Sequence, residues 1–437
     1  MLFVGFFACV AVSAEGIDLE RVRELALANS RSLARYNLAV RNNMLTERGQ
    51  LYSNLPSLSL SGSASMNLWS AGDTPLDNPF DTFSTGVNVS VSQKIFEGGK
   101  SLVLKAINEI TTEMSRKDAL AEYFNVLDSA DNAYYAVLEA AAALEAEEFS
   151  LQTAELSLSM AEVRQASGMI NQGDYLKALA EKESKTASLN QARRNLALNV
   201  TKLKALTGLG EISGAEQVDF DGYGELILRL GNISDAEANA LYAELWKLLA
   251  AANPSLAKAG LTSQKADKNL SLAKRDYSPS LSASFSTGLN YSPNNGLEKS
   301  AGRISISGSI PLDFWVTANN VEKSKIARDS ALLDYAGAES SLETELQTAL
   351  LNTIAQAGSV LSTSRALEYA EKHFEYIMER YRLSQSSVSE LSDASVLVSS
   401  NRSQLIKARY GFLRSLSTLR SLGAIGDEDR LMNILRG

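Results

Sequence analysis

The chain has 437 residues, a net charge of −9 and 45% hydrophobic residues. Charged residues make up 21%, which argues against wholesale disorder, and the acidic balance without any Lys/Arg block argues against a nucleic-acid partner. No run of about 18 or more apolar residues occurs, so no transmembrane helix is expected.

The N-terminal segment, residues 1–14, predicts a secretory signal peptide. Residues 2–12 form a short apolar segment, and residues 12–14 offer the small side chains of a cleavage site. A buried N-terminal strand is the alternative, but no polar residues alternate with the apolar ones. Cys9 follows Phe-Ala, so a relaxed lipoprotein cleavage site stays open as a second alternative. Cleavage after residue 14 would leave a mature chain without a thiol.

Two long stretches without proline predict helices of coiled-coil length. Residues 100–167 contain neither Pro nor Gly, and their apolar residues recur at steps of three and four. With a rise of about 1.5 Å per residue, this helix would be roughly 100 Å long. Residues 318–384 have a similar pattern. Shorter helical patterns, about half as long, flank these two at 19–53, 174–206, 235–276 and 388–422.

The predicted strands form two hairpins, at about 57–96 and 280–312. In each, apolar residues alternate with serine or asparagine, as in PSLSLSGSASMNL and PSLSASFSTGLNY, so one face is apolar and the other polar. Strands of about 10–12 residues cross a bilayer when tilted. The polar face consists almost entirely of serine and other small residues, as expected for the lining of a water-filled pore.

The chain is an internal duplication. Repeat 1 (15–210) and repeat 2 (235–426) each read helix, hairpin, long helix, short helix, and KLKALTGLG before residue 211 matches TLRSLGAIG before residue 427. The insert at 211–234 is predicted to be a loop-rich appendage, and 427–437 a C-terminal tail. Four strands cannot close a barrel, so a closed barrel in lipid requires several chains. A small soluble sheet packed on helices is the alternative.

This order of elements resembles the TolC-like outer-membrane efflux and secretion proteins. The strand starts PSLSLS and PSLSAS, the segment QKIFEGGK at 93–100 and the helix lengths carry the resemblance, which covers nearly the whole chain after the signal. It implies a mainly α fold with membrane β-hairpins, in which three protomers form a 12-stranded outer-membrane β-barrel continued by a periplasmic coiled-coil α-helical barrel.

The same resemblance implies a function, a location and partners. The protein would be the exit duct of a tripartite efflux pump or a type I secretion system, in the outer membrane with its helical tunnel in the periplasm. Its partners would be two further copies, outer-membrane lipid, a periplasmic adaptor and an inner-membrane pump of the RND, ABC or MFS type. No cofactor, metal or nucleic acid is implied.

In this family the tunnel closes where each long helix turns into its short partner. The turns here are 165–175 and 381–394. Tyr381, Glu390 and Asp393 match a tyrosine and two acids whose carboxylates form rings at the entrance. Asp174 matches an acid that hydrogen-bonds the tyrosine in the closed state. The alternative for Glu390 and Asp393 is helix capping, since acids in a first turn favour the helix dipole without any further role.

The tips depart from the family pattern in two places. Ser386 stands where a gate-locking basic residue is found, so closure is expected to be built differently. Ser384 replaces the tip glycine of the second turn, whereas Gly168-Met169 keeps the pattern in the first. The resemblance implies that a periplasmic adaptor docks at the tips, on the residues Gly168, Met169, Ser384 and Gln385.

An enzyme is disfavoured by the residues available. The chain has a single histidine, His373, on a predicted helix, and shows no phosphate-binding loop, nucleophile elbow or metal-ligand spacing. A structural coiled-coil adhesin without a transport role is the alternative function. It would explain the long helices, but not hairpins inserted at matching points of both repeats.

Overall fold

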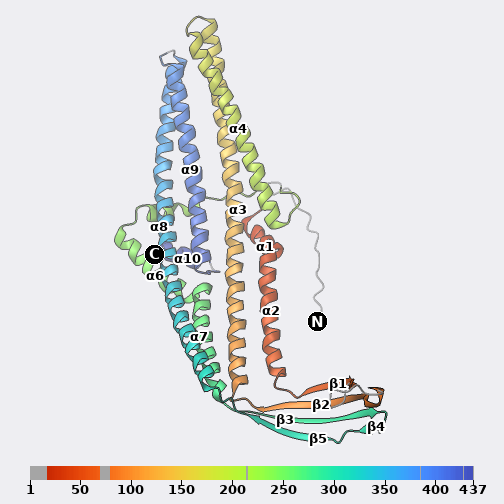
Figure 1. Ribbon diagram of the computed structural model, residues 1–437. Coiled ribbons are helices and arrows are strands. Elements are labelled where there is room, and N and C mark those ends of the chain that lie inside the picture. The colour runs from red at the N-terminus through yellow and green to blue at the C-terminus, as the bar shows by residue number, and fades with distance from the viewer. Residues whose placement is uncertain (1–16, 69–78, 213–214, 384, 427, 437) are drawn as a thin grey trace. The chain divides into compact units, whose positions relative to one another are not determined.

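The computed structural model describes residues 17–68, 79–212, 215–383, 385–426 and 428–436 (Figure 1). The predicted signal segment, with Cys9, lies outside these residues. The chain divides into two compact units. Unit 1 comprises Met1–Arg35, Ala119–Pro254 and Glu339–Gly437; unit 2 comprises Tyr36–Asp118 and Ser255–Ala338.

The fold class expected from the sequence is the one observed, a mainly helical chain with a few strands. The helices are α1 (Leu19–Asn29), α2 (Arg31–Tyr52), α3 (Lys100–Ala166), α4 (Gln172–Thr207), α5 (Gly224–Gly231), α6 (Asp235–Ala252), α7 (Pro254–Lys274), α8 (Phe314–Arg382), α9 (Val388–Leu422) and α10 (Glu428–Arg436). Short 3-10 turns are η1 (Pro79–Thr82), η2 (Asp221–Tyr223) and η3 (Arg275–Tyr277). Across the described residues, no helix combines the length and apolarity needed to span a membrane.

Two helices expected to be continuous are each divided in the structure. The pattern at 19–53 breaks at Ser30, which leaves the helical conformation (ψ 108°) and accepts a hydrogen bond from the Leu33 N–H through its hydroxyl at 3.1 Å. One serine therefore ends α1 and caps α2. The pattern at 235–276 breaks at Asn253 (ψ 120°), because the residue before a proline is driven out of the helical region.

The insert and the C-terminal tail are more ordered than their composition suggests. The expected loop-rich appendage contains α5, and the expected tail contains α10. Leu226 and Leu230 of α5 and Leu435 of α10 are buried in unit 1, and Arg229 donates to the Leu435 carbonyl at 2.8 Å. Burial of an apolar face stabilises these short helices despite the neighbouring glycines and aspartates.

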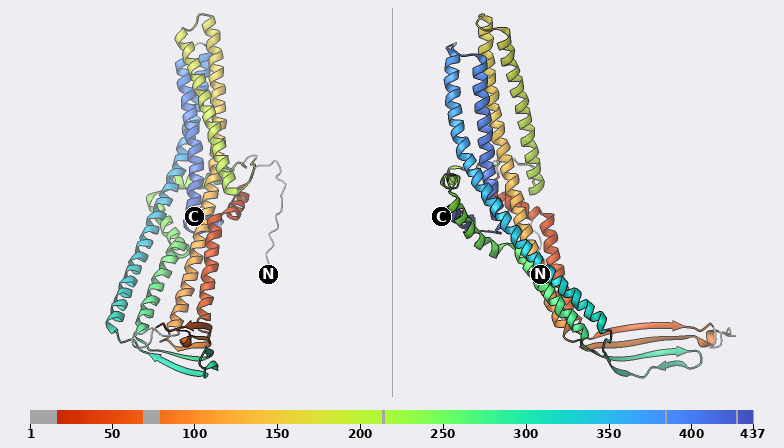
Figure 2. Two further views of the ribbon diagram at one scale, coloured as in Figure 1. Left: turned by 45° about the vertical axis from the view of Figure 1, so that its right-hand side comes forward. Right: turned by 60° about the vertical axis from the view of Figure 1, so that its left-hand side comes forward.

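Unit 2 contains one antiparallel sheet (Figure 2). Its strands are β1 (Ser57–Ser65), β2 (Ser84–Phe96), β3 (Ser280–Ser292), β4 (Gly296–Lys299) and β5 (Arg303–Ser309). β2 pairs with β3, so the two repeats share one sheet, and both β4 and β5 pair with β3. β4 and β5 are thus two pieces of one returning strand, and the sheet has the four strand positions expected. β1 and β5 form its outer edges.

The pairing register sorts the side chains by chemistry. Ser59 lies opposite Ser90, which lies opposite Ser286, and the Ser59 and Ser90 hydroxyls are hydrogen-bonded at 2.6 Å. One residue along, Leu58 is in register with Val91, Phe285 and Ile304 on the other face. This apolar face is open in the single chain, with Leu58 74% and Ile304 78% exposed. The sheet therefore carries a serine face and an uncovered apolar face.

A glycine corner joins β2 to α3 within unit 2. Gly98 and Gly99 have φ of +61° and +73°, a conformation that favours glycine. A Cβ on Gly98 would lie 2.3 Å from that of Ser278, and one on Gly99 would lie 2.2 Å from Nη1 of Arg275. Arg275 Nη1 in turn donates to the Gly98 carbonyl at 2.6 Å. The left-handed backbone at both positions and the close approach of Ser278 to Gly98 explain why this corner has no side chains.

The core of unit 1 encloses a group of charged side chains. The Asp131 carboxylate (1% exposed) accepts hydrogen bonds from Arg23 Nε at 2.7 Å and Nη2 at 3.0 Å, from Arg420 Nη2 at 2.7 Å and from the Ser417 hydroxyl at 2.7 Å. We call these four residues the Asp131 cluster. It connects α1, α3 and α9, which lie far apart in the sequence.

Candidate functional site: the tips of two helical hairpins

The α3–α4 and α8–α9 turns lie at the same end of unit 1 (Figures 1 and 2). The first turn begins with a left-handed glycine: Gly168 has φ +73°, and Met169 N–H donates to the Arg164 carbonyl at 2.8 Å. This pattern is a Schellman-type helix end. Asn171 then caps α4 by accepting from the Asp174 N–H at 2.9 Å. Gly168 and Met169 are exposed at this tip, Met169 at 69%.

The second turn closes through backbone and arginine contacts. Gln385 N–H donates to the Arg380 carbonyl at 2.7 Å, and Arg380 Nη2 donates back to the Gln385 carbonyl at 2.7 Å. Gln385 is exposed, as is Leu383, at 66%. Ser384, the fourth expected docking residue, lies outside the described residues. Exposed side chains thus mark both tips.

The two acids expected at the gate differ in their local roles. Glu390 completes a capping box: its Oε2 accepts from the Ser387 N–H at 2.8 Å, and its N–H donates to the Ser387 hydroxyl at 3.1 Å. Asp393 lies one turn further along α9, and both carboxylates are exposed in the single chain. The capping role considered for Glu390 is therefore observed, and it uses one of the two carboxylate oxygens. Asp393 has no such capping bond among the contacts of the described residues.

Tyr381 lies in a small apolar core at the tips. It is 0% exposed and packs with side chains from all four helices of the two hairpins: Ala161, Ala178, Ile377, Met378, Val388, Leu391 and Ala394. Burial raises the pKa of its hydroxyl. Within the described residues, that hydroxyl has no hydrogen-bond partner, so the bond to Asp174 implied by the resemblance is not made in the single chain. Asp174 is half-buried in the first turn of α4.

Arg164 is the tip residue that the sequence did not single out. Its guanidinium carbon lies 3.8 Å from the centre of the Tyr381 ring, and its Nη2 donates to the Tyr381 carbonyl. The two residues are 217 positions apart, so no local pattern signals their contact. A basic side chain is therefore present at the tips, although Ser386 is not basic. Ser386 instead donates its hydroxyl to the Ile377 carbonyl at 3.2 Å.

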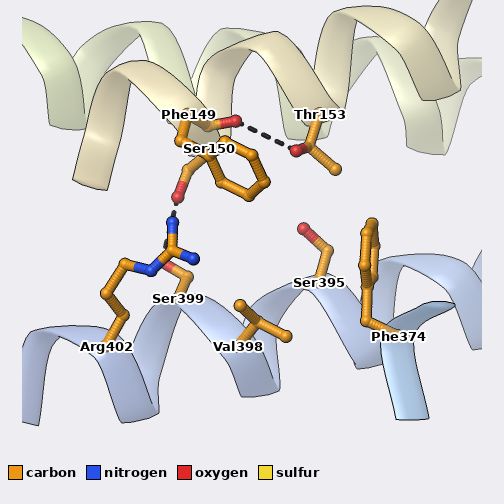
Figure 3. A pocket seen from close by; sticks show the side chains of 8 residues that line it. All are labelled: Phe149, Ser150, Thr153, Phe374, Ser395, Val398, Ser399 and Arg402. Atoms are coloured by element: carbon orange, nitrogen blue, oxygen red, sulfur yellow. Dashed lines mark hydrogen bonds between the residues drawn. The ribbon is translucent and has the colours of Figure 1, made fainter. Parts of the chain in front are cut away.

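Further contacts join the two hairpins along their length. Lys177 Nζ on α4 lies 2.6 Å from the Ser389 hydroxyl on α9, and Lys185 Nζ lies 3.3 Å from the Ser399 hydroxyl. A cavity of about 10 Å³, barely one water in size, lies between α3, α8 and α9. Figure 3 shows Arg402 reaching from α9 to the Phe149 ring on α3, 4.6 Å from its centre. Polar contacts thus join the hairpins in addition to the apolar core around Tyr381.

No metal or catalytic chemistry is evident in this region. Among the described residues, no three His, Cys, Asp or Glu side chains are placed to hold a metal ion. The single histidine, His373, is exposed on α8.

The chain has clear similarities to known proteins. A family model described as "Outer membrane efflux protein" matches residues 22–209 and 245–424. Comparison with curated proteins gives no significant match. A structure of CusC has a TM-score of 0.78 at 17% identity, with 93% of this chain and 92% of that chain covered. The Campylobacter jejuni CmeC outer membrane channel has a TM-score of 0.77 at 16% identity (100% and 94% covered). The Neisseria gonorrhoeae MtrE outer membrane channel in its open state has a TM-score of 0.73 at 17% identity (93% and 88% covered).

Proposed function

Because this chain belongs to the outer membrane efflux protein family, we propose that it is the exit duct of a tripartite efflux pump, or of a type I secretion system, gated at the tips of its helical hairpins. Proteins of this family are outer-membrane transport channels rather than enzymes. The observation that carries the proposal is the sheet of unit 2, with its serine face, its uncovered apolar face and its two open edges.

The open edges of the sheet support an assembly of several chains, and the channels of this family are trimers. β1 and β5 each have one neighbour among the described strands, and an unpaired strand edge is not tolerated in hydrocarbon. Three copies would join β1 of one chain to β5 of the next and close a barrel of twelve strands. Lipid would then cover the apolar face around Leu58 and Ile304, and the serine face would line the water-filled lumen.

The tips are the natural place for a gate in such a trimer. Glu390 and Asp393 lie three positions apart at the start of α9, so their carboxylates share one face of the helix. Three copies would bring up to six carboxylates around the axis, as acidic rings do in cation-selective pores. We assign Glu390 and Asp393 to the entrance, and Asp174 and Tyr381 to its closure. The capping bond of Glu390 would fix the ring's position.

The exposed tips are where we expect the partners to bind. Gly168, Met169, Ser384 and Gln385 are the residues we expect a periplasmic adaptor to contact, linking the duct to an inner-membrane pump of the RND, ABC or MFS type. Met169 supplies an exposed apolar anchor, of the kind found in protein interfaces.

The trimer and the channel are tested on the purified protein in detergent and in planar bilayers. Light scattering is expected to give the mass of three chains, and a stable monomer or dimer would rule out the barrel.

Bilayer recordings are expected to show a cation-selective pore that multivalent cations block. The variant Glu390→Gln/Asp393→Asn should lose both properties, while Glu162→Gln, which alters an exposed carboxylate on α3, should retain them. Wild-type selectivity in the double variant would leave Glu390 as a helix cap only and Asp393 without a role in selectivity. A protein that forms no pore at all would favour the adhesin.

A further inference from the structure

One arginine holds the second hairpin to the first at the tips. Arg164 lies in the last turn of α3, and Tyr381 lies in the last turn of α8. The central carbon of the guanidinium lies over the Tyr381 ring, 3.8 Å from the ring centre. The same guanidinium donates a hydrogen bond to the Tyr381 carbonyl. Arg164 therefore binds both the side chain and the backbone of one residue.

Each part of this contact has a physical basis. The Tyr381 carbonyl is one of the last four carbonyls of α8. These carbonyls have no N–H donor within the helix and lie at the negative end of its dipole. A cation–π contact gains strength when the ring and the cation are shielded from water, and Tyr381 is 0% exposed. Only a planar guanidinium can stack and donate at once. A lysine at position 164 would keep the charge and lose the stacking.

A second contact in which a cation of the α3–α4 hairpin donates to the α8–α9 hairpin lies nearby. Lys177 on α4 donates to the Ser389 hydroxyl on α9 at 2.6 Å. In both contacts the α3–α4 hairpin supplies the cation, and the α8–α9 hairpin supplies a neutral oxygen. If the second hairpin moved away, Arg164 would lose its ring and its carbonyl, and Tyr381 would be exposed to water. The contacts therefore stabilise one arrangement of the hairpins over the other, which is the requirement for a switch.

We propose that Arg164 is the latch of the gate, a positioning residue on the first hairpin that keeps the tips closed. It would replace the basic residue that the family pattern places at position 386, where this chain has a serine. This inference rests on the proposed function, since it takes the tips to be the gate. The latch acts within one chain, so it needs no contact between protomers.

The test combines a distance measurement with a conductance measurement on the full-length protein. Spin labels at Met169→Cys and Leu383→Cys, both at exposed tip positions, report the separation of the hairpins when labelled chains are diluted among unlabelled ones. Arg164→Gln is expected to broaden and lengthen the distance distribution. In bilayers it is expected to raise the open fraction about tenfold or more, the effect of losing a shielded cation–π contact.

Two variants make the result specific. Arg164→Lys should give an intermediate open fraction, because it keeps the charge without the stacking. Arg193→Gln alters an exposed arginine of α4, which lies 3.8 Å from Glu148, and should leave both readouts at wild-type values. An unchanged distance distribution in Arg164→Gln and Arg164→Lys would overturn the latch. Separated hairpins with unchanged conductance would overturn the gate assignment instead, and the two failures are therefore distinguishable.

Discussion

Replacement of Asp131 by alanine is expected to be among the most destabilising single changes in unit 1. Its carboxylate is 1% exposed, and the arginines that it binds, Arg23 and Arg420, have side chains only 9% and 6% exposed. Removing one partner of a buried ion pair leaves an uncompensated charge and costs about 3–5 kcal/mol. The exposed pair Arg21–Glu24, at 49% and 66%, provides the contrast, since such pairs contribute about 0–1 kcal/mol.

Asp128 is expected to moderate this loss. Burial raises the pKa of Asp128, and the negative charge of Asp131 raises it further, whereas Arg420 lowers it. Removing Asp131 takes away the repulsion and leaves Arg420 beside Asp128, whose carboxylate can serve as a substitute anion. Asp131→Ala should therefore fall at the low end of the range, and Asp128→Asn/Asp131→Ala should lose more than the two single changes added together.

The assay is thermal unfolding of the detergent-solubilised protein, followed by circular dichroism at a fixed scan rate and protein concentration, because the unfolding of oligomers depends on both. Asp131→Ala should lower the midpoint clearly, and Glu24→Ala should not. The apolar triple variant Arg23→Met/Asp131→Leu/Arg420→Met should recover most of the loss, since it leaves no buried charge. If Asp131→Ala has the same unfolding midpoint as Glu24→Ala and the wild type, the burial argument is wrong.

Three further outcomes are expected. Burial raises the pKa of Tyr134 to about 12 from 10.0, so the folded state holds this proton more tightly. The resulting stability is present below pH 10 and is lost as the pH rises toward about 12. Tyr134→Phe should reduce this slope in pH-dependent melts without abolishing it, because burial also raises the pKa of Tyr381 and Tyr410. We expect Trp315, 74% exposed at the start of α8 and close to the end of β5, to lie at the membrane interface. It should be quenched by brominated lipid in proteoliposomes, whereas Trp246 of unit 1 should not, each measured as the only tryptophan; equal quenching would contradict this placement. A cysteine at Ser59 should react with an impermeant thiol reagent entering through the lumen, and one at Leu60 should be protected by lipid; the opposite pattern would invert the two faces of the sheet.

The regular parts of the fold could be predicted because their signals are local. The stretch 100–167 lacks Pro and Gly, and α3 runs from Lys100 to Ala166, ending where Gly168 takes a left-handed conformation. The alternation of serine with apolar residues gives both faces of each strand directly, since side chains alternate along a strand. Local signals gave the wrong secondary structure where tertiary packing stabilises a helix. Leu226 and Leu230 stabilise a helix in an insert whose Gly and Asp content favoured loops.

The contacts of the site could not be predicted in the same way. Arg164 is unremarkable in sequence, one basic residue near a helix end, and its role depends on a ring 217 positions away. The Asp131 cluster joins residues separated by 108 and 289 positions. Only the resemblance pointed to Tyr381 and Asp174, and the bond expected between them is absent from the single chain. Long-range pairing is fixed by how the helices pack, which no window of sequence contains.

The open outer strands β1 and β5 bear on how mutations in this protein would behave in a cell that carries both a normal and an altered gene. Each strand would complete its hydrogen bonds only on a neighbouring subunit of the proposed trimer. A chain with one altered outer strand would therefore enter mixed assemblies through its intact edge. The barrel of such an assembly would fail to close at the altered edge. Edge-strand mutations should be dominant, whereas a chain too damaged to pair at either edge should be recessive.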